Sequence, residues 1–306
     1  MPSTQQYAAP EFSSPTNMSV PQNMSVPQES QPTSNASNSL GVPDASLVDP
    51  IFEINDPYSS YTIDNSIWNG FLSKYLVTDV QCINRIRYGS VTCQDHNALK
   101  CYLQQLQSVD TRTLNRDEQL AFWFNLYNAK VVDVVLDNYP IRSVRQIKQK
   151  FTDFVGPFDD EGAVTVLGKP LSLNDIESGI VRPVAKDPRI HYALNCASFG
   201  CPNLSETAWA GQNLDGQLNA AAYRYVNSGR AVKRTWRGVK VAKIYKWYKA
   251  DFGDTDEAVL NHLRQYANAD TLNMLCGQQK IAGHFYDWSL NDGRISRRRL
   301  LEPLIR

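Results

Sequence analysis

The stretch Gln119–Val132 places the strongest constraint on the fold, because it is apolar on nearly every side when drawn as a helix. A helix without a polar face is buried inside a protein rather than exposed at its surface. Asn115 can cap its start, and the pair Tyr139-Pro140 stops it. The sequence therefore predicts a long, central, buried helix over residues 115–138.

Two asparagines, Asn125 and Asn128, lie within this otherwise apolar helix. Asparagine is a poor helix former, so formation of the helix does not require either residue. A buried amide must find hydrogen-bond partners. We therefore expect both side chains to hold a partner segment, and we expect His191 to face the helix beside them.

Most predicted helices precede most predicted strands. That order is typical of the α+β class rather than of a doubly wound parallel sheet, and we expect the buried central helix to pack on a mostly antiparallel sheet. Further helices are predicted at 66–76, 95–106, 172–177, 213–226 and 255–267, with Asp95, Ser172 and Asn213 as caps. Strands are predicted at 189–195 and 285–288, and hairpins at 163–173 and 232–242.

Residues 1–50 differ from the rest of the chain in composition. They hold half of the 16 prolines, four acidic residues and no lysine or arginine. A segment with so few apolar side chains cannot offset its ordering entropy by burial. We expect a disordered tail over 1–50, a single globular domain over 51–293 and an Arg-rich segment over 294–306. The tail is also where we expect a protein partner to bind.

Composition and motifs exclude several functional classes. The 31 Lys+Arg residues balance the 31 Asp+Glu residues, so no global field attracts nucleic acid, and we expect none as a partner. No apolar run reaches about 18 residues, which predicts no membrane span. No Gly-rich phosphate loop is present, and we expect no cofactor. The N-terminus lacks the basic and apolar regions of a secretory signal, so we expect a cytoplasmic protein, with export only if the chain is processed.

The segment His191–Pro202 concentrates the residues that can do chemistry, a histidine and two cysteines. The predicted strand places His191 and Asn195 on one face and Cys196 on the other. It also separates His191 from Cys196 by roughly 16 Å. His191 therefore cannot activate Cys196 directly, whereas Cys201 lies on a returning loop that could approach either residue.

Four interpretations of this segment stay open. In the first, Cys201 or Cys196 is a nucleophile and His191 is its base. Either Asp287 or Glu177 would orient the imidazole. In the second, the two cysteines form a disulfide, structural or redox-active. In the third, they bind zinc with His191, but no fourth ligand is evident, so we expect no metal. In the fourth, these side chains only pack in the core.

Other polar residues are candidates for binding substrate. We predict that Glu177 and Arg182 form a buried ion pair, and both are candidates for substrate contact. Side-chain amides can hold an oxyanion. Asn125, Asn128 and Asn195 are therefore further candidates for positioning a substrate.

Five blocks follow one another in the sequence: Phe122–Ala129, Leu171–Arg182, His191–Pro202, Tyr245–Phe252 and Tyr286–Asn291. In this order they resemble the domain-of-unknown-function family 547, DUF547. The resemblance extends over about 51–291, which is nearly the whole predicted domain. It implies a domain rather than an activity, because the family is defined without a function.

An analogy connects these blocks with known chemistry. Transglutaminase-like and papain-like enzymes take a cysteine from a buried helix, then a histidine and an Asp or Asn from strands. The same order here gives the central helix, His191 and Asp287, with Asn125 or Asn128 in place of the helix cysteine. The leading hypothesis is a thiol-dependent hydrolase or acyl-transferase with a related fold, acting on an unknown small molecule or peptide. The alternative is a non-catalytic interaction module whose polar residues stabilise its core.

Overall fold

The longest helix, α3 (Arg116–Asp137), is buried along most of its length. The computed structural model describes residues 46–147 and 162–293, and the statements below concern those residues. Asn115 caps α3 by accepting a hydrogen bond from the backbone N–H of Glu118 at 3.0 Å. The predicted central helix and its cap are confirmed. The Arg-rich segment 294–306 and residues 1–45 of the predicted tail lie outside the described residues.

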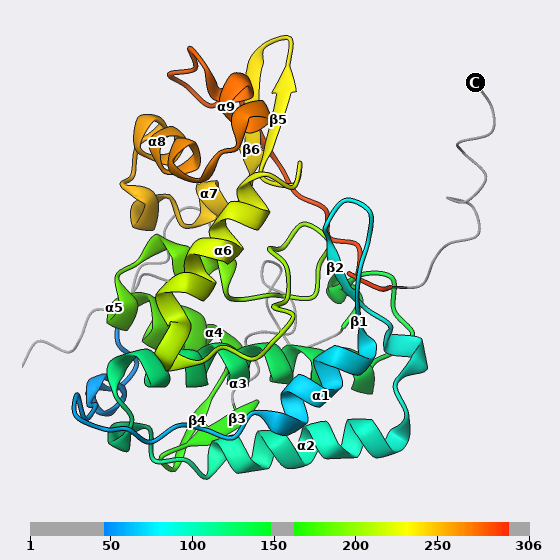
Figure 1. The fold of residues 1–306 in the computed structure, drawn as a ribbon, viewed down its shortest axis with the longest axis vertical. Helices are drawn as coiled ribbons and strands as arrows, with labels where there is room; N and C mark the ends of the chain where they lie inside the picture. The colour runs from blue at the N-terminus through cyan, green and yellow to red at the C-terminus, as the bar shows by residue number, and fades with distance from the viewer. Residues whose placement is uncertain (1–45, 148–161, 294–306) are drawn as a thin grey trace, which may run out of the picture. The chain divides into compact units, whose positions relative to one another are not determined.

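Other helices pack around α3 (Figure 1). α1 (Ser66–Tyr75) and α2 (Cys93–Gln107) lie on one side of it, and α4 (Leu173–Ile176) and α6 (Leu214–Val226) lie on the other. None of the helices in the described ranges has the length and apolarity needed to cross a bilayer. The other helices are the π-helix η6 (Glu177–Val181), α5 (Arg182–Ala185), α7 (Ile244–Trp247), α8 (Asp256–Tyr266) and α9 (Ala269–Leu275). Short 3-10 helices are η1 (Pro50–Glu53), η2 (Tyr88–Ser90), η3 (Thr111–Thr113), η4 (Val144–Gln146), η7 (Pro188–Tyr192), η8 (Gly211–Asn213) and η9 (Lys249–Phe252).

The caps of these helices agree only partly with the sequence-based predictions. Ser172 caps α4 as predicted, by accepting a hydrogen bond from the backbone N–H of Asp175. Helix α2 begins after Thr92, whose hydroxyl accepts the backbone N–H of Asp95 at 3.2 Å, so the predicted cap Asp95 is wrong. Asn213 precedes α6 but makes no side-chain cap bond.

The strands form three small sheets rather than one sheet under the central helix. β1 (Leu76–Thr78) pairs with β2 (Asn84–Ile86), and β3 (Val164–Val166) pairs with β4 (Lys169–Leu171), both antiparallel. β5 (Val232–Thr235) and β6 (Gly238–Ala242) form an antiparallel hairpin, and β7 (Gly283–Phe285) adds to β6 in parallel. Both predicted hairpins and the α+β class are confirmed. The mostly antiparallel strands are divided among these small sheets and do not form one platform beneath α3, and the transglutaminase-like or papain-like suggestion is not confirmed.

Two groups of buried apolar side chains form the core. One surrounds α3, and the other lies between the β5–β6–β7 sheet and helices α6, α8 and α9. The 3-10 helix η7 lies where they meet, because Ile190 belongs to the first group and Tyr192 to the second. The segment that carries His191 is therefore anchored in both.

The predicted strand over 189–195 is wrong. Residues Pro188–Tyr192 form η7, and the carboxylate of Asp187 accepts the backbone N–H of Arg189 at 2.8 Å to start its first turn. Pro188 favours this geometry because its φ is fixed and it has no N–H to donate to a strand. The alternation of side chains from residue 189 to 195 mimics a strand without forming one.

Candidate functional site

Asn128 of α3 fastens the chain just before the two cysteines. Its amide donates to the Ala193 carbonyl at 2.8 Å, and its side-chain carbonyl accepts the backbone N–H of Asn195 at 2.9 Å. Asn125 makes the same pair of bonds to the backbone of Trp209, both at 2.9 Å. Each asparagine is 1% exposed, and both of its polar side-chain atoms bind backbone groups. Their partners are backbone groups and not His191, which corrects the predicted placement of the histidine.

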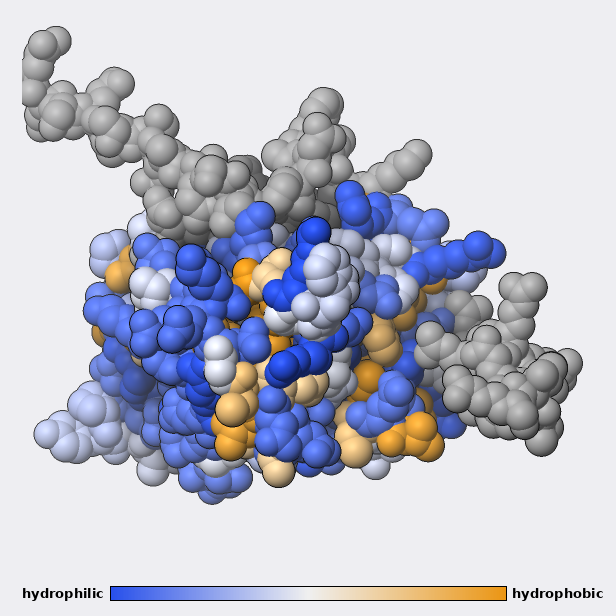
Figure 2. Space-filling model, turned by 90° about the horizontal axis from the view of Figure 1, so that it is seen from above, coloured by the Kyte–Doolittle hydropathy of each residue, from blue (hydrophilic) through white to orange (hydrophobic). Residues whose placement is uncertain are grey.

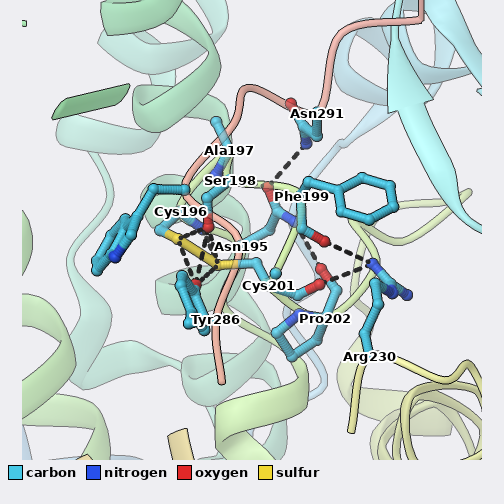
Figure 3. Close-up of a disulfide and its surroundings, with 12 residues drawn as sticks. Asn195, Cys196, Ala197, Ser198, Phe199, Cys201, Pro202, Arg230, Tyr286 and Asn291 are labelled. Carbon is cyan, nitrogen blue, oxygen red and sulfur yellow. Dashed lines mark hydrogen bonds between the residues drawn. A yellow bond between two sulfur atoms is a disulfide. The ribbon is translucent and has the colours of Figure 1, made fainter. Parts of the chain in front are cut away.

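Asn195 shapes the loop between the two cysteines (Figure 3). Its side-chain carbonyl accepts the backbone N–H of Ala197 at 2.9 Å, and its amide donates to the Pro202 carbonyl at 2.6 Å. Ala197 has φ of 59°, the left-handed conformation that this tight turn requires. Asn195 is itself buried, and its side chain closes the loop.

Two other segments hold the loop from outside. The backbone N–H of Gly200 donates to the carbonyl of Asp287 at 2.8 Å. A Cβ atom at Gly200 would lie 2.8 Å from the backbone nitrogen of Asp287, so glycine is needed for this close approach. The guanidinium of Arg230 donates to the carbonyl of Cys201 at 2.7 Å (Figure 3). These hydrogen bonds fix the loop without involving a sulfur atom.

A disulfide joins Cys196 to Cys201, with their Cα atoms 6.3 Å apart (Figure 3). Cys201 is buried, whereas Cys196 is partly exposed. Hence, of the four interpretations of this segment, the structure contains the disulfide. In this state neither sulfur is a thiolate, and a nucleophilic cysteine requires prior reduction.

Hydrogen-bond donors surround the two sulfur atoms. The backbone N–H of Cys196 donates to Cys201 Sγ at 3.2 Å. The Tyr286 hydroxyl lies 3.0 Å from Cys201 Sγ and 3.3 Å from Cys196 Sγ. The Ser198 hydroxyl lies 3.0 Å from Cys196 Sγ. Burial raises the pKa of Tyr286, so its hydroxyl keeps its proton and stays a donor.

His191 contacts a carboxylate that was not predicted for it. Its Nε2 lies 2.7 Å from Oδ2 of Asp251, and its ring stacks on Tyr248 with centroids 4.0 Å apart. Arg182 Nε donates to the same oxygen at 2.7 Å. Burial alone would raise the pKa of Asp251, but hydrogen bonds from His191 and Arg182 outweigh it and hold that pKa below its ordinary value. The imidazole is therefore buried with Nε2 paired to a carboxylate, whereas Nδ1 has no hydrogen-bond partner among the described residues.

Asp287 does not orient His191. Its carboxylate accepts the backbone N–H and the hydroxyl of Ser289, at 2.9 and 2.6 Å. What Asp287 offers the site is its backbone carbonyl, which holds Gly200. The contacts of Asp287 in this structure are therefore with Ser289 and Gly200.

Glu177 does not orient His191 either. It accepts a hydrogen bond from the hydroxyl of Tyr127 at 3.1 Å. Arg182 forms an ion pair with Asp251, whose Oδ2 lies 2.7 Å from Nε, and the negative charge of Glu177 also favours the charged guanidinium. The structure thus gives Glu177 a hydrogen bond with Tyr127 and gives Arg182 an ion pair with Asp251.

The structure thus gathers the predicted residues into two groups. One is the disulfide with its donors, and the other is His191 with Arg182 and Asp251. Within the described part of the chain, no hydrogen bond joins the imidazole to either sulfur. His191 consequently has no contact through which to act as the base of a Cys201 or Cys196 nucleophile.

Sequence reasoning missed four residues of this region: Tyr248, Asp251, Tyr286 and Arg230. The blocks Tyr245–Phe252 and Tyr286–Asn291 of the family resemblance contain the first three. Those blocks were therefore a usable signal. Arg230 falls outside every block, and nothing in the sequence near it indicates its contact with the Cys201 carbonyl.

A separate group, His96, Asp133 and Asp137, brings potential metal-binding atoms within 4.8 Å of one another. The ammonium groups of Lys100 and Lys130 already donate to the two oxygens of Asp133, at 2.7 and 2.9 Å. Lys100 also contacts Asp137. The lysines supply the positive charge that a cation would supply, so we assign this group as an ion-pair network.

Comparison with protein families locates this site within a known domain. Residues 111–226 match the model of a family described as "Protein of unknown function, DUF547". The matched range contains α3, His191 and both cysteines of the disulfide, whereas Asp251 and Tyr286 follow it. Comparisons with curated proteins and with solved structures found no match. The resemblance to the DUF547 family seen in the sequence is confirmed over residues 111–226.

Proposed function

We propose that the function of this domain is thiol–disulfide exchange by Cys196 and Cys201. The observation that carries the proposal is the set of donors at the buried sulfur. The backbone N–H of Cys196 and the hydroxyl of Tyr286 both reach Cys201 Sγ. Donors of this kind stabilise the thiolate that forms when the bond opens.

A purely structural role explains the disulfide less well. Closing so short a loop contributes only about 2 kcal/mol in the chain-entropy model. Hydrogen bonds from Asn195, Gly200 and Arg230 already hold the loop in place. The bond can therefore open while the loop keeps its shape, which is what repeated exchange requires.

The exposures of the two sulfurs set the order of the exchange. A thiolate of a dithiol substrate attacks Sγ of Cys196, the S–S bond breaks, and Cys201 leaves as a thiolate and takes up a proton. The second thiol of the substrate, once deprotonated, attacks its own sulfur in the mixed disulfide. The substrate S–S bond forms, and Cys196 leaves and is protonated. The substrate loses two electrons and two protons, and the cysteine pair gains both.

The thiol-dependent hydrolase or acyl-transferase fits the same donors, because they would also stabilise a nucleophilic Cys201 thiolate in the reduced protein. It needs a base within reach of the sulfur, however, and among the described residues no hydrogen bond joins His191 to Cys196 or Cys201. Tyr286 cannot serve as a base because burial raises its pKa. Exchange needs no base on the protein, since the attacking thiolate arrives already charged, and we favour it for that reason.

The test is an equilibration of the full chain in glutathione buffers of graded redox potential. Samples are quenched with acid, alkylated and mapped by mass spectrometry, and folding is followed by circular dichroism. We expect Cys196 and Cys201 to convert together and reversibly between disulfide and dithiol while the fold persists. The exposed free cysteines Cys82 and Cys276 are internal controls that alkylate in both states. Reduction of the pair only when the chain unfolds would leave the disulfide a structural role.

Single variants test the order of attack. Cys201→Ser should trap glutathione as a mixed disulfide on Cys196, which is partly exposed. Cys196→Ser should trap it far more slowly on the buried Cys201. Equal trapping by both variants contradicts the proposed order. Turnover of an activated ester by the reduced chain, lost in Cys201→Ser, would instead favour acyl transfer.

A further inference from the structure

Between Asp215 and Asp251 the chain carries nine basic residues and no acidic residue. This stretch stands out because positive and negative charges balance over the whole chain, 31 against 31. A run of one sign on a folded element produces a local field even where the net charge is zero. Its position in the fold decides what that field can attract.

The structure places much of this charge on one face of the β5–β6–β7 sheet. Val239 and Val241 of β6 face the core and are fully buried. Lys233 and Lys240 point to the opposite face, and they lie directly across from each other in the β5–β6 register. Lys233 Nζ also lies 4.2 Å above the ring of Phe285 in β7. One face of the sheet is therefore core, and the other is cationic.

The cationic face is not neutralised by the rest of the described chain. Several basic side chains elsewhere are paired, as Lys74 is with Asp95 at 2.6 Å. In residues 46–147 and 162–293, no carboxylate lies within ion-pair distance of Lys233, Lys240 or Arg237. Like charges directly opposite across two strands destabilise a sheet. An external anionic partner would relieve that repulsion.

The tip of the hairpin carries an exposed aromatic residue. Trp236 is 87% exposed, and the guanidinium of Arg237 lies 4.5 Å above its ring. The β5–β6 hairpin projects at one end of the described fold (Figure 1). Figure 2 looks onto that end, where hydrophilic residues dominate the surface. A tryptophan beside arginine on a projecting turn is suited to the headgroup region of a membrane.

We propose that Lys233, Trp236, Arg237 and Lys240, the basic hairpin surface, bind the surface of an anionic lipid bilayer. The lysines and arginine supply attraction to acidic headgroups, and Trp236 supplies apolar contact at the interface. Two such contributions together are what stable peripheral binding requires. The contact is peripheral, so it is compatible with helices that do not span a membrane, and it does not depend on the thiol chemistry.

The arrangement favours a bilayer over nucleic acid. Surfaces that bind single strands offer several open aromatic faces along a groove for stacking bases. On this sheet Lys233 covers Phe285, and Trp236 stands at the tip of a projection. A projecting tip can enter a headgroup layer, whereas it offers a strand no groove to follow.

The test is co-sedimentation of the full chain with phosphatidylcholine vesicles, with and without phosphatidylserine. We expect binding only to the acidic vesicles, and weaker binding as salt is added. Lys233→Glu combined with Lys240→Glu should weaken binding at least tenfold, because one basic residue near such a surface contributes about 1 kcal/mol, or about fivefold. Arg142→Glu combined with Lys186→Glu makes the same charge change at exposed sites elsewhere and should bind as the wild type does.

Trp236 provides a second, independent readout. On binding acidic vesicles, tryptophan emission should shift to shorter wavelength in the wild type, and the shift should be absent in Trp236→Phe. Because Trp236 is exposed, we expect Trp236→Phe to fold as the wild type does. Equal binding to neutral vesicles, or equal weakening by the control pair, overturns the proposal. Binding of a single-stranded oligonucleotide without binding to vesicles also overturns it, in favour of nucleic acid.

Discussion

The hydroxyl of Tyr286 lies 3.0 Å from the sulfur of Cys201 and reaches it from a segment 85 residues further along the chain. A hydroxyl carries one proton, so in the reduced protein it donates to the sulfur that bears negative charge. Cys201, which also receives the backbone N–H of Cys196, is the better placed of the two sulfurs to hold that charge. The relationship makes Tyr286 the residue on which the proposed chemistry depends most.

Replacing Tyr286 by phenylalanine should slow opening of the disulfide. A hydrogen bond to a charged group contributes about 1.5–3 kcal/mol, so we expect reduction by dithiothreitol at neutral pH to be at least roughly tenfold slower. Stopped-flow or quenched alkylation measures the rate. Tyr58→Phe removes the hydroxyl of a tyrosine that is 94% exposed and should leave the rate unchanged. An unchanged rate in Tyr286→Phe would remove its hydroxyl from the mechanism.

Replacing Asn128 by alanine should destabilise the domain. The change leaves the carbonyl of Ala193 and the N–H of Asn195 buried without their partner. We expect a loss of about 3 kcal/mol in the free energy of unfolding, measured with urea. Asn138→Ala removes an exposed amide that contacts Val134, and it should change stability by less than about 0.5 kcal/mol. Similar losses of stability in Asn128→Ala and Asn138→Ala would contradict the role of Asn128 in holding the backbone of Ala193 and Asn195.

Stability should fall with acid in a manner that depends on Asp251. Its pKa is lower in the folded protein than in the unfolded chain, so it contributes stability above the unfolded pKa of about 3.9 and loses it as pH falls through the folded value. The free energy of unfolding should therefore decline more steeply below about pH 4 in the wild type than in Asp251→Asn. Parallel pH curves for the two proteins would contradict the assigned pKa direction.

Replacing Gly200 by alanine should disturb the cysteine loop. The new Cβ would lie 2.8 Å from the nitrogen of Asp287, which must move away. We expect a loss of about 1–3 kcal/mol, seen in thermal or urea unfolding. Gly70→Ala in α1 meets no atom within 4 Å and should stabilise the helix by about 0.5–1 kcal/mol. An unchanged free energy of unfolding in Gly200→Ala would show that the loop has room for a Cβ atom that the structure does not indicate.

The domain should tolerate loss of residues 1–45 but not of 1–50. The backbone N–H of Val48 donates to the carbonyl of Gly179 at 2.9 Å, and Asp49 forms an ion pair with Lys169. These contacts lie before the predicted boundary at residue 50, so we expect the stable domain to begin a few residues earlier. We expect a chain that begins at residue 46 to keep its melting temperature and one that begins at 51 to lose about 3 °C. Identical values would place Val48 and Asp49 outside the stable domain.

The parts of the fold that the sequence predicts are those encoded locally. Asn115 and the apolar pattern after it define α3, and the turn at Gly168 defines the β3–β4 hairpin. Local pattern fails at residues 189–195, where alternation resembles a strand but Pro188 starts a 3-10 helix. At these residues the alternation of side chains favours a strand, whereas the fixed φ of Pro188 favours a helical turn. The chain forms the turn.

The site was predictable in its residue types but not in its pairings. His191 meets Asp251 across 60 residues of sequence, and nothing near either residue indicates the partner. Asp287 looked like a catalytic carboxylate because it lies in the predicted strand 285–288 and follows the central helix and His191 in order, yet it contributes its backbone to the loop. Long-range partners of buried polar groups depend on tertiary packing, which a single sequence does not reveal.

The hydrogen bonds around the cysteine loop have a consequence for how its state can be sensed. None of the hydrogen bonds from Asn195, Gly200 and Arg230 to the loop involves a sulfur atom, so none has to break when the disulfide opens. We therefore expect oxidation to change the shape of the domain very little. A binding partner that distinguishes the oxidised domain from the reduced domain therefore has to contact Cys196 itself, because the two states differ at only a few atoms.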